Sequence, residues 1–223
     1  MPHHGDPGCA PLNSRIIPSS YSDGSADAAL APRSVELFST LDQLEILALP
    51  GGGEHGTFGA GYLIGWKRTG TMPQFEYVTG VSAGALLATQ VFIDDVESLS
   101  AFEGLTDRDI VRIRYFGSLF SDALLDNAPL RKEIATLNDA ATLRSVAAKS
   151  RGGAILQVGV VSLDSGNFIP VNLGALAQDY VDTTDPREKS ILHDLYIYAV
   201  LASTAIPLMM PPSYLNCEMM VDG

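Results

Sequence analysis

Basic residues, histidine and cysteine are all scarce in this sequence of 223 residues. The 14 lysines and arginines are outnumbered by 26 aspartates and glutamates, so the formal net charge at pH 7 is −12. An acidic chain is repelled by nucleic-acid phosphates, which excludes nucleic acid as an expected partner. The same charge argues against docking on anionic lipid through electrostatic attraction.

The scarcity of cysteine and histidine also excludes the common metal sites. Cys9 and Cys217 are the only cysteines, and neither has a histidine nearby at the spacing of zinc ligands. We expect two inert thiols, because two cysteines make no disulfide framework for a chain of this length. The acidic residues form no dense cluster at loop spacing, so calcium is not expected either. The sequence therefore predicts an activity that needs no metal and no cofactor.

Long apolar runs are absent too. No stretch of 18 apolar residues occurs, and the N-terminus lacks the basic-then-apolar layout of a signal peptide. We therefore expect a cytoplasmic protein with peripheral contact at membranes. Residues 1–43 have much proline, glycine and serine without periodicity, which predicts a disordered or loosely attached arm. Residues 44–223 are predicted to form one domain, for which the apolar content of 46% is sufficient.

What the chain does contain is an alternation of short apolar runs and helical repeats, separated by glycine turns. The predicted elements are a strand over 45–49, a turn over 51–56, a helix over 58–70, a strand over 75–79, a turn over 80–84 and a helix over 85–92. Further strands are predicted over 154–161, 168–173 and 219–221, and a further helix over 185–205. This order predicts an α/β fold of three layers, α/β/α, around a mostly parallel sheet with right-handed crossovers.

The two glycine turns together suggest acyl-transfer chemistry. Ser82 lies in Gly80-Val81-Ser82-Ala83-Gly84, where small residues let a strand and a helix pack closely while the serine hydroxyl stays accessible. The N–H groups of Gly52 and Gly53, with that of Ala83, are the natural donors to an oxyanion formed when the serine attacks a carbonyl. Taken alone, the serine turn is also typical of a tight strand-to-helix connection with an unreactive serine.

The first glycine turn has a second interpretation. Gly51, Gly53 and Gly56 match the dinucleotide-binding fingerprint, and Glu76 follows twenty residues after Gly56. In that motif the acidic residue ends the second strand. Glu76 instead precedes three more residues of strand character, so this interpretation is disfavoured.

The general base is not evident from the residues alone. His193 is the only histidine after Ser82, and it falls inside the predicted helix over 185–205, where a surface or polar-contact role is the ordinary expectation. A carboxylate can replace histidine when it is held near the serine, partly desolvated and free of a cationic partner. Asp222 follows an apolar strand and suits this role, but it is equally typical of a turn at a strand end.

The chain resembles the patatin-like phospholipases, and especially their bacterial branch. The resemblance covers about residues 44–223. Besides the glycine turn and the serine turn, it rests on Arg108-Asp109-Ile110, Ala128-Pro129-Leu130-Arg131, Leu163-Asp164-Ser165-Gly166, Ala202-Ser203-Thr204-Ala205-Ile206-Pro207 with Pro211-Pro212, and Val221-Asp222-Gly223.

The resemblance implies a serine acyl hydrolase that cleaves lipid or phospholipid esters with a Ser–Asp dyad and no histidine. Carried over by position, Ser82 is the nucleophile and Asp222 the base. The turn formed by Gly51, Gly52, Gly53 and Gly56, with the N–H of Ala83, is the implied oxyanion hole. A lipid substrate and a transient membrane-surface contact are the implied partners.

Two departures from the family pattern keep alternatives open. Many members carry Arg or Lys where this chain has His55, and members normally continue past the aspartate that matches Asp222, so we expect a domain truncated at its C-terminus. One alternative is a catalytically impaired lipid- or protein-binding module with the same fold. Another is a Ser-Asp-His esterase that uses His193. Residues 110–120, apolar with interleaved arginines, are a candidate interfacial patch or ordinary helix packing.

Overall fold

The computed structural model describes residues 9, 12–13, 15–17, 44–102, 112–113, 125–207 and 210–223. Most of the segment that contains the candidate interfacial patch at 110–120 lies outside the described residues, as does Arg108-Asp109-Ile110. Among the described helices, none is both long and apolar enough to cross a membrane.

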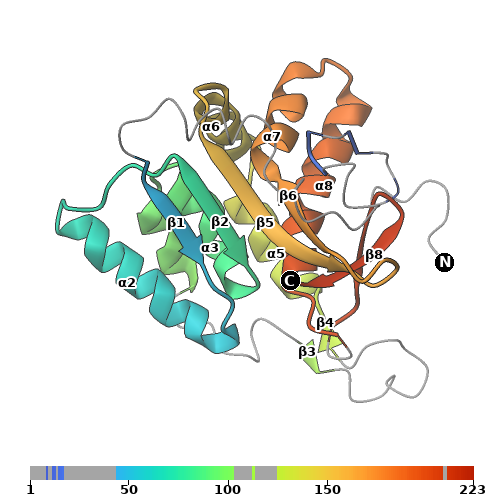
Figure 1. Ribbon diagram of the computed structural model, residues 1–223, viewed down its shortest axis with the longest axis horizontal. Helices are drawn as coiled ribbons and strands as arrows, with labels where there is room; N and C mark the ends of the chain where they lie inside the picture. The colour runs from blue at the N-terminus through green and yellow to red at the C-terminus, as the bar shows by residue number, and fades with distance from the viewer. Residues whose placement is uncertain are drawn as a thin grey trace.

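A mixed six-stranded sheet forms the centre of the molecule, in the order β1-β2-β5-β8-β7, with β6 paired to β5 (Figure 1). Its strands are β1 (Ile46–Leu49), β2 (Tyr77–Val81), β5 (Ile155–Ser162), β6 (Phe168–Asn172), β7 (Ser213–Leu215) and β8 (Glu218–Asp222). β1, β2 and β5 are parallel, whereas β6 and β8 run antiparallel to β5, and β7 runs antiparallel to β8. Two short strands, β3 (Arg112–Ile113) and β4 (Leu125–Asp126), pair separately.

Helices flank this sheet, which confirms the predicted α/β class. They are α2 (Gly56–Arg68), α3 (Ala83–Phe92), α5 (Ala128–Leu137), α6 (Ala140–Arg151), α7 (Leu173–Asp182) and α8 (Pro186–Ser203), with 3-10 turns η4 (Gly53–His55) and η5 (Val96–Phe102). α8 begins as the sequence predicts, because the Asp185 side chain accepts a hydrogen bond from the N–H of Arg187 at 2.9 Å and Pro186 occupies the first turn.

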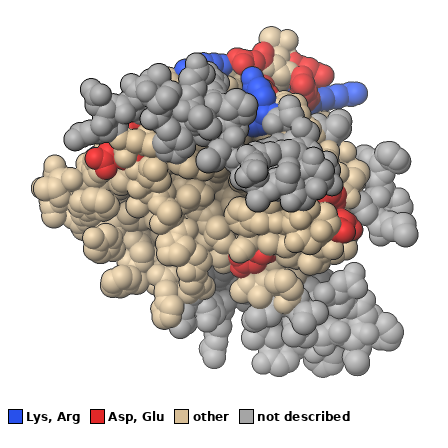
Figure 2. All heavy atoms as spheres, in the orientation of Figure 1, with Lys and Arg blue, Asp and Glu red and all other residues tan. Residues whose placement is uncertain are grey.

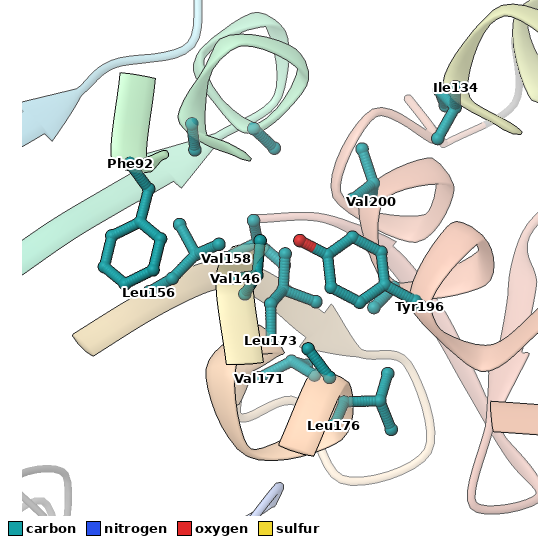
Figure 3. Packing of buried hydrophobic residues seen from close by; sticks show 14 of the residues in the cluster. Phe92, Ile134, Val146, Leu156, Val158, Val171, Leu173, Leu176, Tyr196 and Val200 are labelled. Atoms are coloured by element: carbon teal, nitrogen blue, oxygen red, sulfur yellow. The ribbon is translucent and has the colours of Figure 1, made fainter. Parts of the chain in front are cut away.

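The core lies where α3, α6, α7 and α8 meet β5. Figure 3 shows Phe92 of α3, Leu156 and Val158 of β5 and Tyr196 of α8 in one cluster of buried side chains. The hydroxyl of Tyr196 is paired with Thr89 Oγ1 at 3.0 Å, so this polar atom is satisfied inside the core. Because α3 and α8 are both anchored on β5, the turns that precede α3 and follow α8 are rigidly placed near each other.

The segment before β1 corrects two expectations. Cys9 and Cys217 form a disulfide, so they are not the inert thiols that the sequence predicts. Ile16 is 1% exposed within the core, and its carbonyl accepts a hydrogen bond from the N–H of Asn172 at 2.9 Å. The described part of the arm is therefore held against the domain by burial, by main-chain pairing and by a covalent bond. Local composition carries no information about a partner 208 residues away.

Candidate active site

Ser82 occupies a strained turn between β2 and α3. Its φ is 53° and its ψ −124°, a backbone conformation that residues other than glycine rarely adopt. The flanking glycines make the turn possible, because a Cβ on Gly80 would lie 2.5 Å from the carbonyl oxygen of Gly84. A Cβ on Gly84 would lie 2.2 Å from the carbonyl oxygen of Leu49, so the close approach of β1 and α3 also requires a residue without a side chain at this position.

Strand pairing explains how Asp222 reaches this turn. β6 pairs with one edge of β5, and both β2 and β8 pair with the other. β2 runs parallel to β5 and β8 antiparallel, so the two strands approach each other end to end along the same edge. Val81 lies opposite Gly159, and Asp222 lies opposite the next residue, Val160. Figure 1 shows the C-terminus beside the end of β2 for this reason.

The hydroxyl of Ser82 donates a hydrogen bond to Asp222 Oδ2 at 2.7 Å, although the two residues are 140 positions apart. The backbone N–H of Asp222 donates to the carbonyl of Ala205 at 3.0 Å, which anchors the end of β8 to the segment after α8. Asp222 is half-buried, and it takes part in none of the five ion pairs found among the described residues.

Burial raises the pKa of Asp222 above its ordinary value, because a carboxylate is less stable away from water. The hydrogen bonds from the Ser82 hydroxyl and from the backbone N–H of Gly223 oppose part of this shift. The carboxylate is thus more basic than a solvated aspartate, which is the property that a general base requires.

Ser203, at the end of α8, supports the turn from behind. Its Oγ accepts a hydrogen bond from the backbone N–H of Ser82 at 3.0 Å and donates one to the carbonyl of Gly159 at 2.7 Å. Ser203 lies in one of the segments that carry the family resemblance, but the sequence does not predict it as a site residue. No local pattern distinguishes it from other buried serines. The backbone N–H of Ser82 already donates to Ser203 Oγ, so it is not available to donate to an oxyanion.

The glycine turn lies directly against the serine turn. A Cβ on Gly51 would lie 3.0 Å from the Cβ of Ser82, and a Cβ on Gly56 would lie 2.9 Å from the Cβ of Ala83. Gly52 and Gly53 are exposed, and their N–H groups find no acceptor among the described residues. Ala83 is the first residue of α3, where a helix leaves its N–H groups without intrahelical acceptors. Gly51, Gly56 and Ala83 therefore lie in contact at this site, and Gly52 and Gly53 fall between the two contacting glycines in the chain.

Two other candidates are not at the site. His193 Nε2 lies 2.8 Å from the carbonyl oxygen of Asn138, and ten residues of α8, about 15 Å of helix, separate it from Ser203. The esterase alternative that uses His193 is therefore wrong, because helix geometry holds this ring away from Ser82. Glu76 precedes β2 rather than following it, and its carboxylate accepts the N–H of Glu45 at 2.8 Å, which does not fit the dinucleotide motif.

In the described part of the chain, no group of three or more His, Cys, Asp or Glu side chains is placed to hold a metal ion.

The chain matches the family model described as patatin-like phospholipase over residues 47–223. No curated protein matches it. Among solved structures it is similar to VipD from Legionella pneumophila, with 17% identity and a TM-score of 0.49. The match covers 81% of this chain and 46% of VipD, so this chain spans slightly less than half the length of that protein.

Proposed function

The chain belongs to the patatin-like phospholipase family, and on this basis we propose that it hydrolyses lipid acyl esters with Ser82 as nucleophile and Asp222 as general base. The observation that carries the proposal is the 2.7 Å hydrogen bond from Ser82 Oγ to Asp222 Oδ2. A nucleophile and a base in direct hydrogen-bond contact are the minimum that serine acyl transfer requires.

In the first half-reaction, Ser82 Oγ attacks the ester carbonyl carbon while its proton passes to Asp222. The carbonyl oxygen becomes an oxyanion, for which the N–H groups of Gly52, Gly53 and Ala83 are the proposed donors. When the tetrahedral intermediate collapses, the ester C–O bond breaks and the leaving alcohol takes the proton from Asp222. An acyl group then remains on Ser82.

In the second half-reaction, a water molecule gives its proton to Asp222 as its oxygen attacks the acyl carbon. Collapse of this intermediate returns the proton to Ser82 Oγ and releases the fatty acid. Asp222 thus acts as base and then as acid in each half. The hydrogen bond between Ser82 and Asp222 carries the proton in both directions, and no histidine is needed.

Exposed apolar side chains near the turn support a lipid substrate. Phe58 is 77% exposed and Tyr62 62%, one turn apart on α2, the helix that begins at the glycine turn. Ile206, next to the Ala205 carbonyl that binds Asp222, is 38% exposed. On the face shown in Figure 2, Lys and Arg gather at the top, and the two basic residues of α2, Lys67 and Arg68, lie in its last turn, at the end away from the glycine turn. We propose that this apolar rim makes a transient contact with a membrane surface.

The domain assignment is part of the same proposal. We propose that residues 44–223 form the hydrolase domain. Within it, the ends of β1, β2 and β8 carry the glycine turn, Ser82 and Asp222, respectively.

The proposal is tested by labelling the folded protein with a fluorophosphonate and by measuring hydrolysis of p-nitrophenyl butyrate. We expect a single adduct on Ser82, absent in Ser82→Ala and strongly reduced in Asp222→Asn. Hydrolysis should be lost in both variants. Absence of an adduct in a wild-type protein that binds lipid would favour the catalytically impaired module instead.

A further inference from the structure

A cavity of about 290 Å³ lies between the start of α5, the end of α8 and the segment that leads into β7. Leu201 and Pro211 supply apolar wall, whereas Arg131 supplies the positive charge. The cavity shares two elements with the candidate active site. α8 carries both Leu201 and, two residues later, the Ser203 that binds Ser82. The β7–β8 hairpin carries both the cavity wall and Asp222.

Arg131 has an unused buried donor. Its Nη2 bonds Asp194 Oδ1 at 2.9 Å, and its guanidinium lies over the ring of Tyr198 at 5.1 Å from the centroid. Its Nε is buried, and within the described residues it has no hydrogen-bond partner. Because that Nε–H has no exposed surface, a ligand in the cavity would reach the guanidinium only through its other N–H groups, and the positive charge of Arg131 would attract an anionic ligand there.

The other polar groups on the cavity wall are unused as well. Ser213 is 4% exposed, and its hydroxyl has no partner among the described residues. The side chain of Asn127 makes no capping bond at the start of α5. Tyr198 and Tyr214 also line the cavity, and in the described part of the chain neither hydroxyl has a hydrogen-bond partner. One cation and four neutral groups able to donate therefore surround one space.

We propose that this cavity binds a phosphate group, with Arg131 as its charged ligand and Ser213, Tyr198 and Tyr214 as neutral donors. A tetrahedral anion has oxygens on several sides and can use donors spread around a cavity better than a planar carboxylate can. The volume exceeds that of a lone phosphate ion, so a phosphate ester fits the space better. We assign the phosphate to the headgroup of a lipid substrate, a step that rests on the proposed function.

The first experiment measures binding without turnover. Inorganic phosphate is equilibrated by dialysis with the wild-type protein, Arg131→Met and Lys132→Met, in a phosphate-free buffer at low salt. Lys132 is the matched control, because it carries the same charge on the next residue but does not line the cavity. We expect one phosphate per wild-type chain, affinity weakened about tenfold or more in Arg131→Met, and no comparable change in Lys132→Met. Absence of binding, or equal binding by Arg131→Met, overturns the proposal.

The second experiment distinguishes a lipid phosphate from free phosphate. Hydrolysis of monomeric dihexanoyl phosphatidylcholine is compared with that of dihexanoylglycerol, which has the same acyl chains but no phosphate. If the headgroup occupies the cavity, Arg131→Met raises KM for the phospholipid about tenfold and leaves KM for the neutral ester unchanged. Phosphate binding with an unchanged phospholipid KM overturns the headgroup assignment and makes free phosphate the ligand.

Two controls keep the outcomes separable. If the wild-type protein hydrolyses neither ester, the proposed function fails, while the dialysis result still decides whether the cavity binds phosphate. If Arg131→Met does not fold, as judged by circular dichroism, the double variant Tyr198→Phe/Tyr214→Phe replaces it. Both rings stay, and only the two hydroxyls are lost. A several-fold loss of phosphate affinity in that variant supports the proposal, and unchanged affinity overturns it.

Discussion

The hydroxyl of Ser203 joins the nucleophile turn to the central strand: it accepts the N–H of Ser82 at 3.0 Å and donates to the carbonyl of Gly159 at 2.7 Å. These two contacts link residues from β5, from the β2–α3 turn and from the end of α8. A turn held at φ 53° is unfavourable unless its surroundings maintain it, and Ser203 is completely buried directly behind it. Ser203 is therefore a positioning residue rather than a catalytic one.

Replacing Ser203 by alanine leaves the Ser82 N–H and the Gly159 carbonyl without this partner. We expect the free energy of unfolding to fall by about 1–3 kcal/mol. We also expect kcat for p-nitrophenyl butyrate to fall about tenfold or more with little change in KM, because the hydroxyl of Ser82 loses its orientation. Ser162→Ala is the matched control, since that hydroxyl donates to Glu218 at 2.8 Å on the same sheet. An equal loss of kcat in both variants would contradict a positioning role for Ser203.

The raised pKa of Asp222 predicts how activity and stability depend on pH. Asp222 acts as a base only when ionised, so kcat/KM should fall as the pH drops through this raised pKa. Stability has the opposite dependence. Because the folded protein binds the proton more tightly than the unfolded chain, this group's contribution is largest when it is protonated. That contribution decreases as the pH rises from the ordinary value of 3.8 through the raised pKa.

Asp222→Asn should therefore lose activity by a factor of about 10² or more while its Tm at neutral pH stays equal to or above that of the wild-type protein. Thermal melts and ester hydrolysis measured from pH 4 to pH 8 test both expectations. A clear fall in Tm at neutral pH would mean that the ionised carboxylate stabilises the fold.

Reduction of the Cys9–Cys217 disulfide should destabilise the protein. The bond closes a loop that spans 208 positions of sequence, so its removal frees a large part of the unfolded chain. We expect the free energy of unfolding to fall by about 2–5 kcal/mol in dithiothreitol. The double variant Cys9→Ser/Cys217→Ser should melt at the same temperature with and without the reductant. A wild-type Tm that does not change on addition of the reductant would contradict the presence of the Cys9–Cys217 disulfide.

Removing the apolar side chains of α2 should weaken contact with lipid. Phe58→Ser/Tyr62→Ser, in a Ser82→Ala background, is expected to bind phosphatidylcholine vesicles about tenfold or more weakly in co-sedimentation, because both side chains are exposed beside the glycine turn. Ile191→Ser removes a residue of similar character, 37% exposed on α8, and should bind normally. With Ser82 intact, hydrolysis of a monomeric ester should be unaffected. Unchanged vesicle binding would exclude this rim as the contact.

Two glycines of similar sequence context should respond oppositely to alanine. Gly84→Ala places a Cβ 2.2 Å from the Leu49 carbonyl oxygen, so we expect unfolding or a loss of about 3 kcal/mol or more. Gly61→Ala meets no atom within 4 Å and lies inside α2, so it should stabilise the protein by about 0.5–1 kcal/mol. Urea denaturation compares the two, and a tolerated Gly84→Ala would contradict the close approach of β1 and α3.

Local pattern was a good guide to the elements around Ser82 and to β5, β6, β8 and α8, but it did not predict α6 and α7. Residues 83–92 form α3, close to the predicted 85–92, because small and apolar residues follow a glycine elbow. β2 extends to Val81 rather than ending at residue 79, because its pairing with β5 continues to Gly159 and draws the start of the elbow into the sheet. α6 and α7 had no strong periodic signal, and their helical state depends on packing against each other and on the caps Asp139 and Asn172.

The sequence by itself determined the serine turn. Gly80 and Gly84 are needed where backbone approaches backbone, and this requirement is local. The residues alone left Asp222 open between a general base and a strand-end turn, because a strand-end aspartate carries no signal of what it faces, and only the resemblance favoured the base. The tertiary structure decided that β2 and β8 meet end to end on one edge of β5, which brings Ser82 and Asp222 together across 140 residues. It also decided the support from Ser203 and the Cys9–Cys217 bond. These contacts form between segments far apart in the chain, whose pairing depends on the packing of the whole sheet rather than on any short run of residues.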